Sequence, residues 1–287
     1  MIIAFHKYHA LGNDFIVLHK RLSKLSVAQT PRLVRAICDR HNGVGADGVI
    51  IYDEIRRRYL MRIFNADGGE AEISGNGLRI FAHHIYSCSE SKLKSFVIDS
   101  STGAHAVQIK SGKAEQIVSS VTMAPPNFLV RKVPMRVRAQ FFIRQPFKTK
   151  SGELLGTAVN VGNPHIVFFV DNFDFDWRAF GREVETDKRF PQATNVEFAV
   201  VKSRKRIQHR IWERGVGETS ASGSGAASTV AAGIINGLLD NDVTVEEPAG
   251  RLSIRIDSLD QPIILTGPST YICTGGYWFE QHAKNHR

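Results

Sequence analysis

The stretch HRIWERGVGETSASGSG, residues 209–225, decides the fold because it repeats an earlier stretch without a gap. The earlier stretch is MRIFNADGGEAEISGNG, residues 61–77, at an offset of 148 residues. A second pair repeats at an offset of 150 residues, LGNDFIV from Leu11 and VGNPHIV from Val161. We therefore interpret the chain as two copies of one fold unit, arranged about a pseudo-twofold axis so that two equivalent loops can face one cleft.

The composition is typical of a globular protein of two domains. The chain has 287 residues, of which 43% are hydrophobic. It contains no run of 18 apolar residues and does not open with a basic and then apolar leader, so we expect neither a membrane span nor a secretory signal. Three cysteines at no metal-ligand spacing predict a reducing, cytoplasmic location and no metal: Cys38, Cys88 and Cys273.

The net charge of +9 comes largely from three basic runs, residues 55–62, 130–138 and 202–210. A basic surface can attract nucleic acid. These runs lack interleaved aromatic residues and any helix-turn-helix pattern, so we interpret them as solvated strand edges. Binding of nucleic acid is accordingly the last-ranked function.

Short apolar or alternating runs predict a protein made mostly of strands, with few helices. The expected strands are residues 2–8, 14–20, 48–53, 60–65, 96–110, 158–170, 196–201, 207–213, 252–257 and 263–267. One helix is expected over Thr30–Asp39, with Thr30 as its N-cap and a proline at its first position. Two apolar helices, Gly77–Tyr86 and Gly225–Leu239, are expected to be buried, each inside a curved sheet.

Each copy of the repeat places a serine and glycines directly before one of these apolar helices. A helix N-terminus exposes unpaired N–H groups and carries a partial positive charge. Ser74 and Ser222 would be ordinary N-caps if either motif stood alone. Because the motif occurs twice at matched places, we favour a ligand site that holds a carboxylate between the two loops.

The ordered motifs HALGNDF, GVGADGV, FNADGGE, SGNGLR, VGNPH, FPQATNVEF and WERGVGETSASGSGAAS resemble the diaminopimelate epimerase family over nearly the whole chain. The resemblance implies an α/β (α+β) fold of two pseudo-symmetric domains, each a β-sheet wrapped around a central helix. The expected first domain spans residues 1–125 and adds a C-terminal strand, 272–280. The second spans residues 126–271, where Pro125-Pro126 favours an extended linker, and residues 281–287 form a tail.

The same resemblance implies a two-base mechanism without pyridoxal phosphate, any other cofactor or metal. One group removes the α-proton while its partner delivers a proton to the opposite face. By motif position these groups are Ser74 and Ser222, where the family has cysteines; Ala227 stands where the family often has a further cysteine. His165 and Glu213 match residues that the family places beside the two acid/base groups.

Serine in place of cysteine is a large chemical change. A free thiol has a pKa of about 8.5, and a serine hydroxyl ionises roughly five units higher. Forming the basic serine therefore costs about 6–7 kcal/mol more, on the order of ten-thousand-fold or worse in rate if nothing compensates. A serine base normally needs an adjacent histidine or lysine.

The resemblance also assigns substrate recognition. Side chains matching those that hold the zwitterionic ends of the substrate are Asn13, Asn65, Asn163, Asn195, Glu213 and Arg214. Backbone groups matching those that hold the reacting carboxylate are at Gly75, Asn76, Gly223 and Ser224. Gly48 stands where some relatives have a polar side chain, which affects contacts to the distal end of the substrate.

The function expected from the resemblance is conversion of LL- to meso-diaminopimelate, in the lysine and peptidoglycan pathway, by a chain that binds a small amino acid and forms a homodimer. The two serines leave alternatives open. The chain can be an engineered double variant, an isomerase or dehydratase of a different carboxylate, or a binding protein that has lost turnover. The intact recognition motifs argue against random decay without separating these alternatives.

Overall fold

The computed structural model describes residues 1–23, 29–55, 58–89 and 92–280, so the expected tail at 281–287 lies outside the described residues. The chain divides into two compact units. The second unit is Ser120–Gly267, and the first comprises the residues before it together with those after it. The boundaries expected from the sequence, after residues 125 and 271, each lie a few residues beyond the divisions in the structure. The difference arises because the chain passes between the units inside a continuous strand, β8 or β17.

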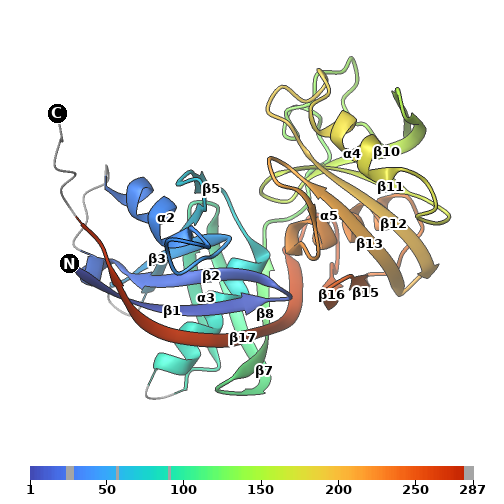
Figure 1. Ribbon diagram of the computed structural model, residues 1–287. Helices are drawn as coiled ribbons and strands as arrows, with labels where there is room; N and C mark the ends of the chain where they lie inside the picture. Colours follow the sequence, from blue (N-terminus) through green and yellow to red (C-terminus); the bar gives the residue numbers. More distant parts are fainter. Residues whose placement is uncertain (24–28, 56–57, 90–91, 281–287) are drawn as a thin grey trace, which may run out of the picture. The chain divides into compact units, whose positions relative to one another are not determined.

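The first unit is built on strands from both ends of the chain (Figure 1). They are β1 (Ile2–Ala10), β2 (Asn13–His19), β3 (Gly48–Ile55), β4 (Arg58–Asn65), β5 (Glu70–Ala71), β6 (Ser95–Ser100), β7 (Gly103–Lys113) and parts of β8 (Gln116–Met123) and β17 (Ile263–Trp278). Pairing is antiparallel for β17–β1 and β1–β2, parallel for β2–β3, antiparallel for β3–β4, parallel for β4–β6 and antiparallel for β6–β7.

The second unit repeats this order of pairings. Its strands are β9 (Gln145–Thr149), β10 (Gly152–Asn160), β11 (Pro164–Phe169), β12 (Asn195–Ser203), β13 (Arg206–Glu213), β14 (Gly217–Thr219), β15 (Asp242–Glu247) and β16 (Gly250–Arg255), with the first part of β17. Pairing is antiparallel for β10–β11, parallel for β11–β12, antiparallel for β12–β13, parallel for β13–β15 and antiparallel for β15–β16. The two copies read from the sequence are thus two copies of one topology.

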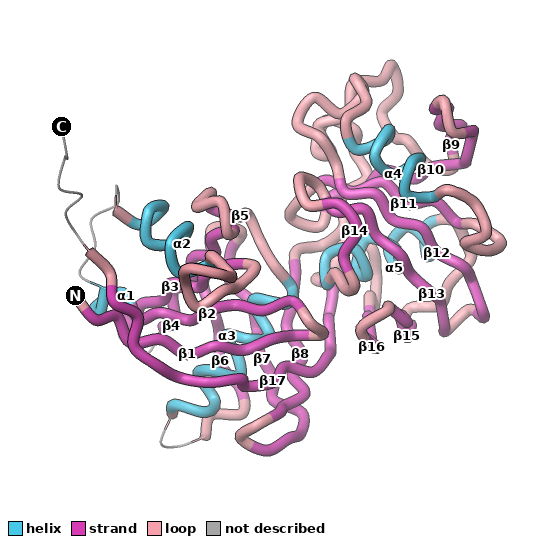
Figure 2. Tube along the Cα trace, viewed as in Figure 1, coloured by secondary structure: helices cyan, strands magenta, loops and turns pink. Residues whose placement is uncertain are grey.

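One helix runs through the middle of each unit. These central helices are α3 (Gly75–Cys88) and α5 (Gly223–Ile235). Helix α3 contacts β1, β2 and β7, and α5 contacts β10, β11, β12 and β16. Figure 2 shows each helix in cyan among the magenta strands of its own unit. The expected fold of a sheet wrapped around a central helix is confirmed, and it explains why both helices are apolar nearly all round.

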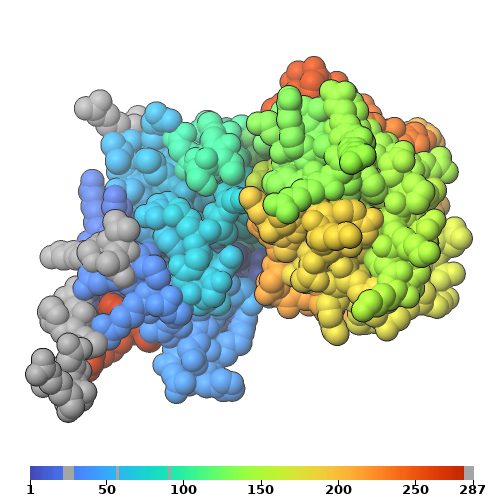
Figure 3. Space-filling view, turned by 90° about the horizontal axis from the view of Figure 1, so that it is seen from above, coloured from blue at the N-terminus to red at the C-terminus, as the bar shows by residue number. Residues whose placement is uncertain are grey.

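A shorter amphipathic helix packs on the outside of each sheet. These helices are α2 (Thr30–Cys38) and α4 (Trp177–Glu185). Helix α2 contacts β3 and β4, and α4 contacts β12 and β13. Leu33 and Ile37 are buried on α2, as Phe180 and Val184 are on α4. In the space-filling view of Figure 3, green and yellow atoms, which include β9 to α4, form much of the second unit's visible surface.

The structure corrects several boundaries. Gln29, not Thr30, is the N-cap of α2, and it makes no side-chain capping hydrogen bond. The C-terminal strand is one continuous β17 rather than separate strands at 263–267 and 272–280. Among the described residues, five strands and two helices were not expected from the sequence alone: β5, β8, β9, β14, β15, α4 and the four-residue α1 (Lys20–Ser23). The marginal length or mixed polarity of these segments gives little periodic signal.

The sequence repeat is reproduced residue by residue in hydrogen-bonded register. Strand β4 pairs with β5 through Ile63↔Ala71, and β13 pairs with β14 through Ile211↔Thr219. Both pairs differ by the same offset that relates the two sequences. Glycine-rich turns close each pair, and each β-ribbon leads directly into a central helix.

Arginines of the basic runs form ion pairs at the surface. Arg58 pairs with Asp99, and Arg204 pairs with Asp240. Among the described residues, no helix combines the length and apolar character needed to cross a membrane.

Candidate active site

Ser74 and Ser222 occupy equivalent positions with nearly identical backbone geometry. Ser74 is the N-cap of α3 with φ −142° and ψ 118°, and Ser222 is the N-cap of α5 with φ −142° and ψ 117°. Ser74 Oγ accepts a hydrogen bond from the Gly77 N–H at 3.0 Å, and Ser222 Oγ accepts one from the Gly225 N–H at 3.1 Å. Both serines are therefore helix caps, and the oxygen that caps each helix is the atom to which the family resemblance assigns proton transfer.

This position favours a negative charge on either hydroxyl oxygen. The helix dipole places partial positive charge there, and a hydrogen bond from N–H to an ionised oxygen is stronger than one to a neutral oxygen. The N–H groups of Gly75 and Asn76, and those of Gly223 and Ser224, open the two helices and have no intrahelical acceptor. Each unit thus offers the backbone donors that a carboxylate requires.

In the first unit, Asn13 and Asn76 are joined in a polar chain. Asn76 Nδ2 donates to Asn13 Oδ1 at 3.1 Å, and Asn13 Nδ2 donates to Asp47 Oδ2 at 2.8 Å. The buried Arg79 donates to Asn76 Oδ1 at 2.8 Å and fixes that amide. Asn65 is exposed at the end of β4, where its backbone closes the turn to Gly69.

In the second unit, Asn163 and His165 meet the start of α5. His165 Nε2 lies 2.7 Å from Asn163 Oδ1, and Asn163 Nδ2 lies 3.5 Å from Ser224 Oγ. His165 Nδ1 lies 2.7 Å from Glu197 Oε1, and the two side chains are fully buried. Burial raises the pKa of Glu197 well above its usual range, while the charge of His209 opposes that rise.

Asn195, Glu213 and Arg214 lie along the neighbouring strand ends. Asn195 Nδ2 donates to Pro164 O at 2.9 Å, and its Oδ1 accepts from the Arg214 N–H at 3.0 Å. Thr219 Oγ1 donates to Glu213 Oε2 at 3.0 Å across the β13–β14 ribbon. Hydrogen bonds therefore order all three residues next to the loop that carries Ser222.

Sequence reasoning missed three buried ionisable residues in this region: Glu197, His209 and Glu247. His209 and Glu197 lie on adjacent antiparallel strands, and His209 Nδ1 lies 3.0 Å from Glu247 Oε1. One sequence pattern could have revealed them, the alternation of inward and outward side chains along β13. In that alternation His209 falls at an inward position between the buried Ile207 and Ile211. An ionisable side chain at an inward position of a strand needs a partner, which predicts a second charged residue nearby.

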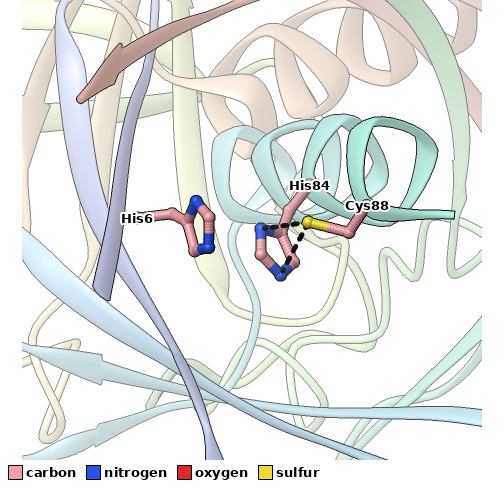
Figure 4. Close-up of side chains that lie close together, drawn as sticks. All are labelled: His6, His84 and Cys88. Carbon is pink, nitrogen blue, oxygen red and sulfur yellow. Dashed lines mark hydrogen bonds between the residues drawn. The ribbon is translucent and has the colours of Figure 1, made fainter. Parts of the chain in front are cut away.

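A separate group of potential metal ligands comprises His6 of β1 with His84 and Cys88 of α3, whose ligand atoms all lie within 4.8 Å of one another (Figure 4). Both His84 nitrogens already have hydroxyl partners, Tyr8 at 3.2 Å and Tyr52 at 3.1 Å. Cys88 Sγ lies 3.8 and 3.9 Å from these nitrogens, so it sits over the ring face rather than along either lone pair. Burial lowers the pKa of His84 to about 3. We interpret this cluster as packing, not as a metal centre.

The chain is similar to known proteins over most of its length. The sequence profile described as diaminopimelate epimerase matches residues 5–129 and 157–272. The chain is 37% identical to a diaminopimelate epimerase of Halothermothrix orenii over 281 residues, 96% of this chain and 98% of that protein. It is 38% identical to one of Nostoc punctiforme over 282 residues, 96% and 99% of the two chains.

A solved structure shares the fold at low identity. The hydroxyproline epimerase of Agrobacterium vitis, with bound trans-4-hydroxy-L-proline, matches with a TM-score of 0.70 and 12% identity over 96% of this chain and 90% of that chain. The fold and the full-length matches define the class of protein, an isomerase of the amino-acid epimerase type. Within this class, the chain belongs to the diaminopimelate epimerase family.

Proposed function

We propose that this chain epimerises diaminopimelate between its LL and meso forms, without pyridoxal phosphate, using Ser74 and Ser222 as the two acid/base groups. The observation that supports this most is the matched capping geometry of the two serines in two copies of one unit. The substrate's reacting carboxylate is assigned to the N–H groups at the starts of α3 and α5. Its remaining polar ends are assigned to the five side chains Asn13, Asn65, Asn163, Asn195 and Arg214, with Glu213 beside them.

Serine suits one half of this reaction better than the other. A carbanion at the α-carbon is a far stronger base than an alkoxide, so a serine hydroxyl can protonate it. Removing the α-proton is harder because the hydroxyl must first lose its own proton, at the cost of about 6–7 kcal/mol relative to a thiol. The helix dipole returns only about 0.3–2 kcal/mol of this. Slow inversion is therefore the expected behaviour of the chain.

The alternative is isomerisation or dehydration of a different carboxylate, or ligand binding without turnover. A titration calorimetry experiment with LL- and meso-diaminopimelate addresses recognition apart from chemistry. We expect both isomers to bind, and Arg214→Ala to weaken binding by at least about tenfold through loss of a charged hydrogen bond. Absence of binding by both isomers, with binding of another dicarboxylate, would assign the site to a different substrate.

The domain boundaries given by the sequence, the homodimer and the cytoplasmic location stay predictions. Gel filtration with light scattering at several protein concentrations measures the oligomeric state directly.

Thr219→Val should lower kcat about three- to tenfold with little change in KM. Thr219 Oγ1 donates to Glu213 Oε2, and a hydrogen bond to a charged group contributes about 1.5–3 kcal/mol when it is fully realised. Thr219 and Glu213 are half-buried and accessible to water, which reduces the free energy that this hydrogen bond contributes. Kinetics of Thr219→Val beside Thr219→Ser, which retains the hydroxyl, checks this prediction. Equal losses in the two variants would show that the hydroxyl does not position Glu213.

Alkylation with iodoacetamide should leave turnover intact. Burial raises the pKa of Cys38 to about 12 and raises that of Cys88, which keeps both in the unreactive thiol form. All three cysteines lie outside the serine-bearing loops, Cys273 being on β17. Activity before and after treatment, with modification counted by mass spectrometry, is the measurement. Inactivation that substrate prevents would place a native thiol in the site.

A further inference from the structure

The buried pair His209–Glu247 lies directly against the loop that carries Ser222. Glu247 Oε1 accepts two hydrogen bonds, from the Ser222 N–H at 2.9 Å and from His209 Nδ1 at 3.0 Å. One carboxylate oxygen therefore connects the imidazole to the backbone of the serine. Both side chains are 1% exposed, so solvent does little to stabilise their charges.

His209 presents an unused nitrogen in the same region. Its Nε2 has no hydrogen-bond partner among the described residues, although it is buried. A buried nitrogen without a hydrogen-bond partner lowers the stability of the fold, so its presence here indicates a function for that atom. Glu247 accepts from Nδ1, which directs the free lone pair of a neutral imidazole to Nε2 and makes that atom a proton acceptor.

Gly225 brings the imidazole and the serine close together. A Cβ on Gly225 would lie 3.2 Å from His209 Cε1, 3.2 Å from Ser222 Cβ and 2.9 Å from Ile211 Cδ1. His209 Cε1 and Ser222 Cβ are therefore no farther apart than twice 3.2 Å, and the Ile211 side chain packs beside them. A proton passes from Ser222 Oγ to His209 Nε2 when the two atoms come within hydrogen-bond reach, directly or through one water.

The first unit lacks this pair, which makes it an internal control. Tyr59↔Ile98 in the β4–β6 register corresponds to Ile207↔Val245 in the β13–β15 register. Two residues further along, His209 and Glu247 correspond to Met61 and Ser100. Ser74 and Ser222 thus share their backbone geometry. Of the two, it is Ser222 whose backbone N–H is hydrogen-bonded to an imidazole–carboxylate pair.

We propose that His209 and Glu247 form a proton relay for Ser222, a positioning and proton-accepting pair that lets a serine act as the base. This inference rests on the proposed function. The Ser222 O–H bond breaks and its proton moves to His209 Nε2, while Glu247 balances the imidazolium. Ser222 Oγ then takes the α-proton, and the Cα–H electron pair stays on the substrate. Ser74 donates a proton to the opposite face, after which His209 releases its extra proton to solvent and Ser74 takes one up from solvent.

The ionisable groups that face His209 come from two strands. Glu247 on β15 bonds its Nδ1, and Glu197 on β12 interacts with it through charge. His165 on β11 lies behind Glu197 and bonds it at 2.7 Å. Helix α5 contributes no ionisable side chain over its length. The relay is thus one end of a buried series of ionisable groups that begins at His165.

A cysteine introduced at residue 222 reports on this relay without any substrate. In Ser222→Cys, we expect alkylation by iodoacetamide to rise with pH at a midpoint at least about one unit lower than in Ser222→Cys/His209→Met, because a nearby imidazolium favours the thiolate. His209→Gln, which retains a donor for Glu247, provides a second variant if the methionine destabilises the fold. Mass spectrometry of the peptide carrying residue 222 separates its modification from that of native cysteines.

The matched control is Ser74→Cys, with and without His209→Met. Its midpoint should not move, because Met61 stands where the second unit has His209. If the midpoint of Ser222→Cys is unchanged on loss of His209, the relay is overturned. An equal shift in the midpoint of Ser74→Cys overturns it as well, since it would indicate a general structural effect.

Kinetics then separate the relay from the proposed reaction. In a Ser74→Cys background that retains Ser222, His209→Met should lower kcat by about 100-fold or more, the contribution expected of a positioned base. In the Ser74→Cys/Ser222→Cys background the loss should be under about tenfold, since a thiol needs no such base. Equal losses in the two backgrounds overturn the relay. A midpoint shift in a protein whose cysteine variants never invert diaminopimelate would instead retain the relay and reject the proposed substrate.

Discussion

Ser74→Cys combined with Ser222→Cys should raise the rate of diaminopimelate inversion by several orders of magnitude. Each thiol lies at a helix N-cap, where the partial positive charge lowers its pKa below the usual value of about 8.5. The energy needed to form the base then falls by about 6–7 kcal/mol, on the order of ten-thousand-fold in rate. Substrate binding should change little, because the recognition side chains are untouched.

Either single variant should gain much less than the double variant. Each direction of the reaction needs one base and one acid, and the two directions share one transition state, so a serine on one face slows inversion in both directions. Racemisation rates of both single variants and the double variant, on diaminopimelate, histidine, lysine and glutamate, provide the measurement. A double variant that is inert on all four, while the original chain isomerises or dehydrates another acid, would contradict the proposed reaction.

Phe198→Ala should destabilise the second unit by about 3–5 kcal/mol. Phe198 is fully buried on β12, beneath helix α4. Its ring contacts four aromatic neighbours at centroid distances of 5.7 to 6.1 Å, namely Phe168, Phe175, Trp177 and Phe180. Truncation removes these contacts and leaves a cavity that the surrounding β-sheet cannot collapse to fill.

Urea denaturation monitored by circular dichroism measures this loss. The control is Phe141→Ala, which removes the same atoms from a side chain that is 45% exposed and should change stability by less than about 1 kcal/mol. Similar losses for the two variants would show that the aromatic cluster around Phe198 is not the centre of the second unit's core.

The repeat at residues 61–77 and 209–225 predicted two copies of one unit, each with a strand, a glycine-rich loop and an apolar helix that follows a serine, while the sheet around each helix was expected from the family resemblance. The structure has β4–β5–α3 and β13–β14–α5 in matching register, and the short strands β5 and β14 were not predicted. Helix α4 was missed because its apolar residues, Trp177, Phe180 and Val184, are separated by charged ones over only nine residues. Strand β15 was missed because its acidic residues mask the buried alternation of Val243 and Val245.

In the candidate site, features set by local sequence could be predicted, whereas contacts that depend on the tertiary fold could not. Both N-caps follow from local motifs, which is why Ser74 and Ser222 could be singled out from the sequence. The contact of His209 with Glu247 depends on the parallel pairing of β13 with β15 across a long connection. No spacing rule predicts that pairing, so the contact between these two residues could not be predicted until the fold was known.

The most direct test of the proposed function is incubation of the unaltered chain with LL-diaminopimelate in deuterated water, followed by mass and chirality analysis at low conversion. A two-base mechanism on serines predicts slow formation of the meso isomer carrying one solvent deuterium at the inverted carbon, while the recovered LL isomer stays largely unlabelled. Recovery of unlabelled LL-diaminopimelate alone, from the unaltered chain and from the double cysteine variant alike, would contradict that mechanism.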